Sequence, residues 1–158
     1  MSATTRLGQD ESTPTQIAEH LRRCGVDFRP ALSDRVDIDE YAQKIGSRAM
    51  RFEAWAGGTL VGLAAVYAND PTGEMAFLTS VSVVRDHQGQ GVATALLARV
   101  IDSTRRKGFK RLALEVEREN VAAVRLYTRA GFATGAEQDR MIQMDLELQG
   151  SGRMEIEP

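Results

Sequence analysis

The middle of the chain changes from a helix-like to a strand-like pattern of hydrophobic and polar positions. Residues 50–55 and 60–67 show this pattern, and residues 56–59 (Ala-Gly-Gly-Thr) between them are typical of a hairpin turn. Residues 69–73 (Asn-Asp-Pro-Thr-Gly) give a second turn signal, and residues 74–84 continue as another strand. The pattern therefore predicts an antiparallel meander of three strands.

Two short amphipathic helices are predicted before this meander. Residues 13–16 (Thr-Pro-Thr-Gln) form a capping box with proline at the first helical position, and Gly25 ends the helix. Asp37 is a favourable cap for a second helix, whose apolar face is Ile38, Tyr41, Ala42 and Ile45. Residues 28–33, between the two helices, have no periodic pattern.

A longer helix and a strand follow the meander. Residues 91–107 carry an apolar helical face, and Gly108 ends this helix. Residues 111–117 alternate as a strand, which places Glu115 and Glu117 on the face opposite the leucines. Because a helix separates this strand from the preceding one, we predict that the two pair in parallel through a right-handed crossover.

One more helix and one more strand complete the pattern. Residues 120–130 are predicted as a helix that Asn120 caps and Gly131 ends, and residues 141–148 alternate as a half-exposed antiparallel strand. The predicted fold class is α/β (α+β): a central mixed, mostly antiparallel sheet with one parallel crossover pair, flanked by about four helices.

The bulk properties of the chain favour a single domain. We place it at residues 13–148 of the 158, between a flexible N-terminal arm (residues 1–12) and a flexible C-terminal tail (residues 149–158). A net charge of −2 gives no electrostatic reason to expect nucleic acid, and the single Cys24 excludes an intrachain disulfide. With no apolar run that would cross a bilayer, we expect a cytoplasmic protein with no membrane partner.

The segment from Val83 to Ala93 carries the first candidate chemistry. It places Gly89 and Gly91 between an apolar strand and the start of a helix. A helix N-terminus has unsatisfied N–H donors and a partial positive charge, and glycine lets a ligand approach the backbone closely. This turn therefore predicts a phosphate-binding site.

A second motif follows after one helix and one strand, in residues 120–132. Asn120 and Tyr127 are seven residues apart, so they lie on one helix face with the small Ala123 between them. Together with residues 88–93 (Gln-Gly-Gln-Gly-Val-Ala), this helix resembles the GNAT superfamily of acetyl-CoA-dependent N-acetyltransferases. The resemblance covers residues 50–148, and it implies the fold of that superfamily and acetyl-CoA as co-substrate, without a metal.

The resemblance also implies a set of site residues. It assigns the pantetheine arm to the edge of the strand before the turn, the pyrophosphate to the turn, and a hydrogen bond from the pantetheine to Asn120. The expected cofactor-binding residues are Ser82, Val83, Val84, Gln88, Gly89, Gln90, Gly91, Val92, Ala93, Thr94, Asn120, Ala123 and Tyr127. The N–H of Val83 is the candidate for polarising the thioester carbonyl.

Two side chains are candidates for proton transfer. The resemblance implies that Tyr127 protonates the departing thiolate, although a buried aromatic packing residue explains the same position. Glu115 is the first candidate for the general base, acting through a water, and an ordinary exposed strand glutamate is the alternative. Ser80 and Ser82 offer a substrate contact instead, with bulk water taking the proton.

Two other functions fit parts of the same sequence. Residues 89–94 nearly match a dinucleotide-binding fingerprint, but Thr94 occupies the third small position, and too little chain follows for a doubly wound sheet. A coenzyme-A-binding sensor without turnover would share the fold. His20 and His87 are far apart and have no ligand-like neighbours, so no metal site is expected.

The acceptor amine is the least specified part of the prediction. The acidic residues Asp34, Asp37, Asp39 and Glu40 would attract a cationic amine, although a solvated helix start is the favoured explanation of the same residues. A faint likeness of residues 28–42 to GNAT enzymes of cell-surface sugar synthesis points to an amino sugar. Peptide or protein amines remain the alternative, and a homodimer is possible in this family.

Overall fold

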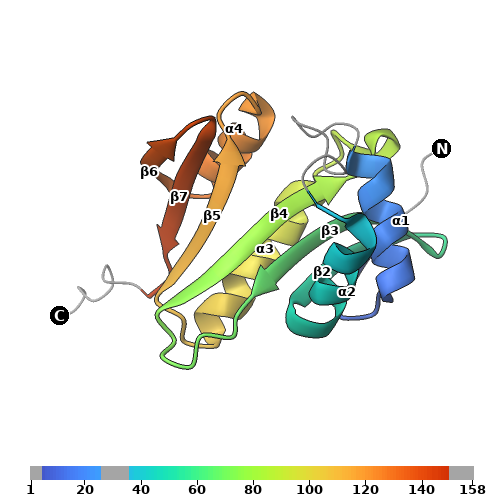
Figure 1. Cartoon of the computed structure of the whole chain (residues 1–158), viewed down its shortest axis with the longest axis horizontal. Helices are drawn as coiled ribbons and strands as arrows, with labels where there is room; N and C mark the ends of the chain where they lie inside the picture. Colours follow the sequence, from blue (N-terminus) through green and yellow to red (C-terminus); the bar gives the residue numbers. More distant parts are fainter. Residues whose placement is uncertain (1–4, 26–35, 150–158) are drawn as a thin grey trace.

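The computed structural model describes residues 5–25 and 36–149, apart from the side chain of Ser80. Our predictions for residues 1–4, 28–33, Asp34 and 150–158 lie outside this part of the chain. In the described part, seven strands form one sheet in the order β1-β2-β3-β4-β5-β7-β6 (Figure 1). The strands are β1 (Arg6–Gln9), β2 (Met50–Ala56), β3 (Thr59–Tyr67), β4 (Met75–Val83), β5 (Arg111–Glu117), β6 (Ala133–Gln138) and β7 (Met141–Glu147).

The predicted meander and crossover are both confirmed. Strands β2, β3 and β4 pair antiparallel in succession. Strands β4 and β5 pair in parallel, with Met75 opposite Arg111 and Leu78 opposite Leu114. Helix α3 (Val92–Arg106) joins these two strands, so the sheet is mixed, as the sequence predicts.

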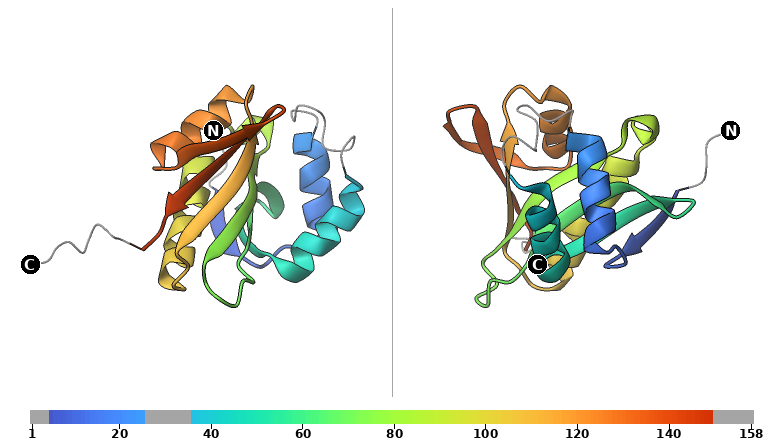
Figure 2. Two further views of the ribbon diagram at one scale, coloured as in Figure 1. Left: turned by 60° about the vertical axis from the view of Figure 1, so that its left-hand side comes forward. Right: turned by 45° about the vertical axis from the view of Figure 1, so that its right-hand side comes forward.

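Helices cover both faces of the sheet. Helices α1 (Pro14–Gly25) and α2 (Ile38–Arg48) pack on one face, and α3 and α4 (Val121–Arg129) lie on the other (Figure 2). A one-turn 3-10 helix, Arg85–His87, leads from β4 toward α3. None of the helices in the described residues is long and apolar enough to span a membrane.

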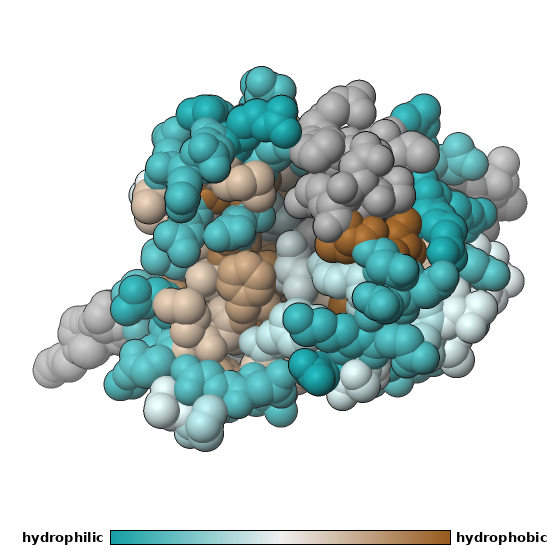
Figure 3. All heavy atoms as spheres, viewed as in Figure 1, coloured by the Kyte–Doolittle hydropathy of each residue, from teal (hydrophilic) through white to brown (hydrophobic). Residues whose placement is uncertain are grey.

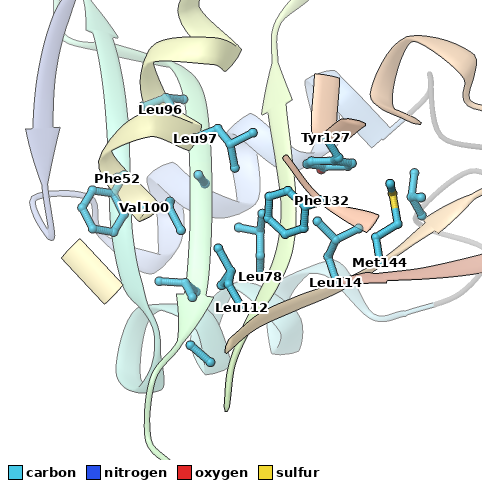
Figure 4. Close-up of a cluster of buried hydrophobic side chains, with 14 of the residues drawn as sticks. Phe52, Leu78, Leu96, Leu97, Val100, Leu112, Leu114, Tyr127, Phe132 and Met144 are labelled. Atoms are coloured by element: carbon cyan, nitrogen blue, oxygen red, sulfur yellow. The ribbon is translucent and has the colours of Figure 1, made fainter. Parts of the chain in front are cut away.

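The larger of the two apolar cores lies between the sheet and the α3/α4 layer. Leu96 and Val100 of α3 are fully buried against alternate residues of the strands. Tyr127 of α4 and the following Phe132 lie side by side near Leu114 (Figure 4). This packing fixes the helix that carries Tyr127 against the sheet.

Two predicted helix caps are confirmed here. The Thr13 N–H donates to Gln16 Oε1 at 2.9 Å and the Gln16 N–H donates to Thr13 Oγ1 at 3.2 Å, which is a capping box. Asp37 accepts from the Glu40 N–H at 3.1 Å. These local signals set the helix starts as the sequence predicts.

The structure corrects the predicted N-terminal arm. Residues 6–9 form strand β1, which pairs antiparallel with β2. The buried carboxylate of Glu53 accepts hydrogen bonds from the Glu11 and Ser12 N–H groups, so this segment is held against the sheet. The arm prediction was therefore wrong for these residues, because the partner that orders them lies about 40 residues further along the chain.

At the other end, strand β6 was not predicted. Its sequence, Ala-Thr-Gly-Ala-Glu-Gln, has no apolar alternation, and all six residues are exposed. It is ordered by pairing with β7 at the edge of the sheet. Gln149, the first residue of the predicted tail, donates to the carbonyls of Arg105 and Phe109 at 3.0 and 2.8 Å.

Candidate active site

The pairing of β4 with β5 stops before either strand ends. The last parallel partners are Leu78 and Leu114, yet β4 continues to Val83 and β5 continues to Glu117. The pairing register with β3 shifts at this point, which leaves Thr79 as the extra residue of a β-bulge. Beyond the bulge the two strands diverge toward α4 (Figure 1).

The unpaired end of β4 turns backbone groups into this gap. The Val84 N–H donates to the Val61 carbonyl of β3 at 2.9 Å. Because backbone groups alternate sides in an antiparallel pair, those of Val81 and Val83 face away from β3. The Gln88 side chain confirms this direction, since its Nε2 donates to the Val83 carbonyl at 3.0 Å.

The glycine-rich turn lies at the end of this gap. Gly89 and Gly91 have φ angles of 79° and 82°, and Gly91 is the left-handed N-cap of α3, with no side-chain cap bond. A Cβ built on either glycine would meet nothing within 4 Å, so the backbone is open to a ligand. The first N–H groups of α3 have no acceptor inside the helix, which makes the turn a suitable anion site.

Gap and turn together form a cleft of about 780 Å³. Its lining brings together most of the predicted site: Ser82, Val83, Gln88, Gly89, Gly91, Val92, Ala93, Thr94, Glu115, Asn120, Ala123 and Tyr127. Two predicted residues, Val84 and Gln90, are outside this lining. Val84 is buried and bonds to β3 through its N–H, so it belongs to the core rather than to the cleft.

Charges of opposite sign line different parts of the cleft. Arg85 and His87 lie beside the turn, where a phosphate group would be favoured. Glu115 and Glu117 of β5 lie across the gap, with Glu119 just beyond. This arrangement suits an extended ligand with an anionic end and a second ligand that is cationic.

Tyr127 lies deep in the cleft. Its side chain is 4% exposed and its ring makes an edge contact with Phe132, with ring centroids 5.7 Å apart. Burial raises the pKa of Tyr127 to about 12, and a backbone hydrogen bond with Val81 acts in the opposite direction. The hydroxyl is therefore protonated near pH 7 and is available as a donor.

Asn120 and Glu115 both line the cleft. Asn120 caps α4, since its Oδ1 accepts from the Ala123 N–H at 3.2 Å. The predicted cap is therefore confirmed, independently of any ligand contact. Glu115 is exposed, between the buried Leu114 and Val116, so it projects from the sheet face that carries α1 and α2. The same face exposes Met75 and Phe77 of β4, and Figure 3 shows apolar side chains in the middle of it.

A buried contact between α1 and β4 was missed by the sequence analysis. His20 is 1% exposed, and its Nδ1 lies 3.1 Å from the Leu60 carbonyl while its Nε2 lies 2.9 Å from Ser82 Oγ. Burial lowers the pKa of His20 to about 4, with a further contribution from the nearby positive charge of Arg23. The sequence analysis considered His20 only as a metal ligand, and nothing in the sequence pattern linked it to Ser82.

No group of three or more metal-ligating side chains comes together within residues 5–25 and 36–149.

The comparisons with known proteins agree with the geometry of the cleft. The model of the acetyltransferase (GNAT) family matches residues 15–132, which include both sequence motifs. The chain belongs to the GNAT acetyltransferase family.

Relatives of this GNAT chain are similar over part of their length. A probable N-acetyltransferase, camello, from Xenopus tropicalis is 30% identical over 108 residues, covering 68% of this chain and 49% of that protein. N-alpha-acetyltransferase 30 from Schizosaccharomyces pombe is 34% identical over 56 residues, covering 35% of this chain and 37% of the relative. The chain thus spans about half or less of the curated relatives that it matches.

Solved structures confirm the predicted GNAT fold. The ribosomal-protein-S18-alanine N-acetyltransferase from Escherichia coli superposes with a TM-score of 0.75 at 24% identity, covering 95% of this chain and 97% of that one. A putative acetyltransferase from Salmonella typhimurium, solved with its cofactor acetyl-CoA, gives a TM-score of 0.72 at 23% identity, covering 92% of this chain and 94% of the other. At these identities the likeness establishes the fold alone.

The buried His20 makes stability depend on pH. Its folded-state pKa of about 4 lies below the ordinary value of 6.5, so between these values the unfolded chain binds a proton that the folded chain does not. The contribution is fully present above pH 6.5 and is lost as the pH falls toward 4. We expect the free energy of unfolding to drop by about 2 kcal/mol more between pH 7 and pH 4.5 in the wild type than in His20→Gln. Urea unfolding at both pH values measures this, and equal drops would contradict a buried neutral His20.

Proposed function

We propose that this protein is an N-acetyltransferase that moves the acetyl group of acetyl-CoA to a primary amine by direct attack. The observation that carries the proposal is the cleft between β4 and β5. It joins the open backbone of Val81 and Val83 to the glycine turn at the start of α3, with the Tyr127 hydroxyl against the same strand. Family membership supports the same reaction class.

The cofactor fits this cleft by its chemistry. Its pyrophosphate would accept hydrogen bonds from the turn and the first N–H groups of α3. Its amide-containing arm would pair with the open edge of β4, replacing the Gln88 side chain at the Val83 carbonyl. The Val83 N–H remains our candidate for polarising the thioester carbonyl, and the Val81 N–H faces the same gap.

The reaction then balances without a covalent enzyme intermediate. The amine nitrogen attacks the thioester carbon, the carbon–sulfur bond breaks, and the products are an amide and the coenzyme A thiol. Glu115 would take the proton of the amine through a water, because its carboxylate is exposed on the sheet face that the amine approaches. Tyr127 would give its proton to the departing sulfur.

A second observation bears on the acceptor. Met75 and Phe77 are 42% and 38% exposed, which is unusual for large apolar side chains, and they lie on the same sheet face as Glu115. This strip favours an amine with an apolar substituent, such as a hydrophobic amino acid or a peptide N-terminus. An amino sugar remains the alternative acceptor, because its amine would interact with the acidic residues and would not need the apolar strip.

Release of free thiol from acetyl-CoA tests the proposal. The acceptor panel would contain L-phenylalaninamide, a peptide that begins with alanine, a lysine-containing peptide with a blocked N-terminus, and glucosamine. Turnover with any of them supports an acetyltransferase, and the preferred amine identifies the acceptor class. Binding of acetyl-CoA without turnover on any amine would instead support a coenzyme-A-binding sensor.

Removing the Tyr127 hydroxyl should slow the reaction more than it weakens cofactor binding. We expect Tyr127→Phe to lower kcat about 100-fold, while the Kd for acetyl-CoA changes less than about threefold. Steady-state kinetics and calorimetry measure the two quantities. Tyr67→Phe is the matched control, because the Tyr67 hydroxyl is buried without a hydrogen-bond partner in the described structure and is outside the cleft. An unchanged kcat in Tyr127→Phe would remove Tyr127 from the acid role.

Removing the Glu115 carboxylate should affect the rate most at low pH. We expect Glu115→Gln to lower kcat at least about tenfold at pH 7. The kcat of this variant should return toward the wild-type value as the pH rises and the free amine becomes abundant. A pH–rate profile measures this. Glu147→Gln, an exposed carboxylate of β7 outside the cleft lining, should behave as wild type. A profile for Glu115→Gln that matches the wild type would leave proton removal to water.

A further inference from the structure

Helix α1 places an imidazole directly behind the open end of β4. His20 contacts the Leu60 carbonyl through Nδ1 and Ser82 Oγ through Nε2. Ser82 also lines the cleft, between the two residues whose backbone groups face the gap. Nothing in the proposed acid and base roles of Tyr127 and Glu115 uses this contact.

The partners of His20 determine which ring nitrogen carries the hydrogen. A carbonyl oxygen only accepts hydrogen bonds, so the Nδ1 atom beside Leu60 must be the protonated one. In the neutral ring Nε2 is then bare, and the contact at 2.9 Å requires Ser82 to donate its hydroxyl hydrogen. The longer contact of Cys24 Sγ with Nε2, at 3.6 Å, is directed at the same bare nitrogen.

This arrangement fixes what Ser82 offers to a ligand. With its only hydrogen held by His20, the Ser82 oxygen presents lone pairs and therefore acts as an acceptor. Its side chain lies on the sheet face that carries α1, which is also the face of Glu115. The low pKa of His20 supports the arrangement, because a protonated ring would reverse the hydrogen bond.

We propose that Ser82 Oγ accepts a hydrogen bond from the nitrogen of the attacking amine, and that His20 is the positioning residue that keeps Ser82 in the accepting state. This inference rests on the proposed acetyltransferase function. The thioester itself has no hydrogen to donate, and the amides of the cofactor arm are served by the strand backbone in the plane of the sheet. An amine that approaches from the α1 face carries N–H groups, and the Ser82 oxygen can accept a hydrogen bond from one of them.

Two variants test the proposal in the thiol-release assay, with L-phenylalaninamide as the first acceptor and then the rest of the panel. Ser82→Ala removes the acceptor, and His20→Leu frees the Ser82 hydrogen. We expect each to raise the KM for the amine about tenfold, with the Kd for acetyl-CoA within about twofold of the wild type. Cys24→Ala is the matched control, since it also alters packing beside His20 but leaves Nε2 free to accept from Ser82.

A measurement on the resting protein tests the premise separately. Long-range proton–nitrogen NMR reports which ring nitrogen of each of the two histidines is protonated, and the signal that remains in His87→Gln is that of His20. We expect hydrogen on Nδ1 and none on Nε2 of His20 at pH 7. Hydrogen on Nε2 would overturn the proposal even if His20→Leu failed to fold.

The kinetic outcomes separate this proposal from the proposed function. An unchanged KM for the amine in Ser82→Ala would overturn the Ser82 assignment and leave the acetyltransferase intact. A weakened acetyl-CoA Kd with an unchanged amine KM would assign Ser82 to the cofactor instead. A wild-type protein that acetylates no amine would contradict the proposed function, and this inference with it.

Discussion

The site depends on two neighbouring strands that stop pairing while both continue. Backbone N–H and carbonyl groups buried in a protein need partners, so an unpaired strand end at the centre of a sheet is costly unless something binds to it. In this protein Gln88 meets the Val83 carbonyl, and Tyr127 makes a backbone hydrogen bond with Val81. An amide-containing cofactor arm is the kind of ligand that replaces such partners.

The surrounding elements keep this gap open and place the candidate functional groups around it. The bulge at Thr79 changes the course of β4 beyond Leu78, and the buried pair of Tyr127 and Phe132 packs α4 against the diverging strands. The left-handed Gly91 starts α3 at the end of the gap, with the helix N-terminus beside it. On the opposite face, α1 brings His20 to Ser82. Under our proposals, the two helix layers would therefore serve the cofactor and the amine separately.

Local signals explain how much of this could be predicted. The capping box of Thr13 and Gln16, the cap of Asn120 and the helix between two strands each act within a few residues, and the structure has all three. Strands β1 and β6 were missed because pairing partners, rather than their own patterns, order them. In the cleft, the glycine turn was readable in the sequence. The contact of His20 with Ser82 joins residues 62 positions apart, so only the fold reveals it.

Calorimetric titration with acetyl-CoA tests the central claim most directly, when the wild type is compared with Gly91→Ala and Gly58→Ala. Both glycines have positive φ angles, 82° and 89°, and open space at the Cβ position, so alanine adds similar backbone strain at each. Only Gly91 lies in the cleft. We expect the wild type and Gly58→Ala to bind acetyl-CoA alike, in preference to NAD⁺ and ATP, and Gly91→Ala to bind at least about tenfold more weakly. Folded wild-type protein that does not bind acetyl-CoA, or equal affinity in the two variants, would contradict a cofactor site at this turn.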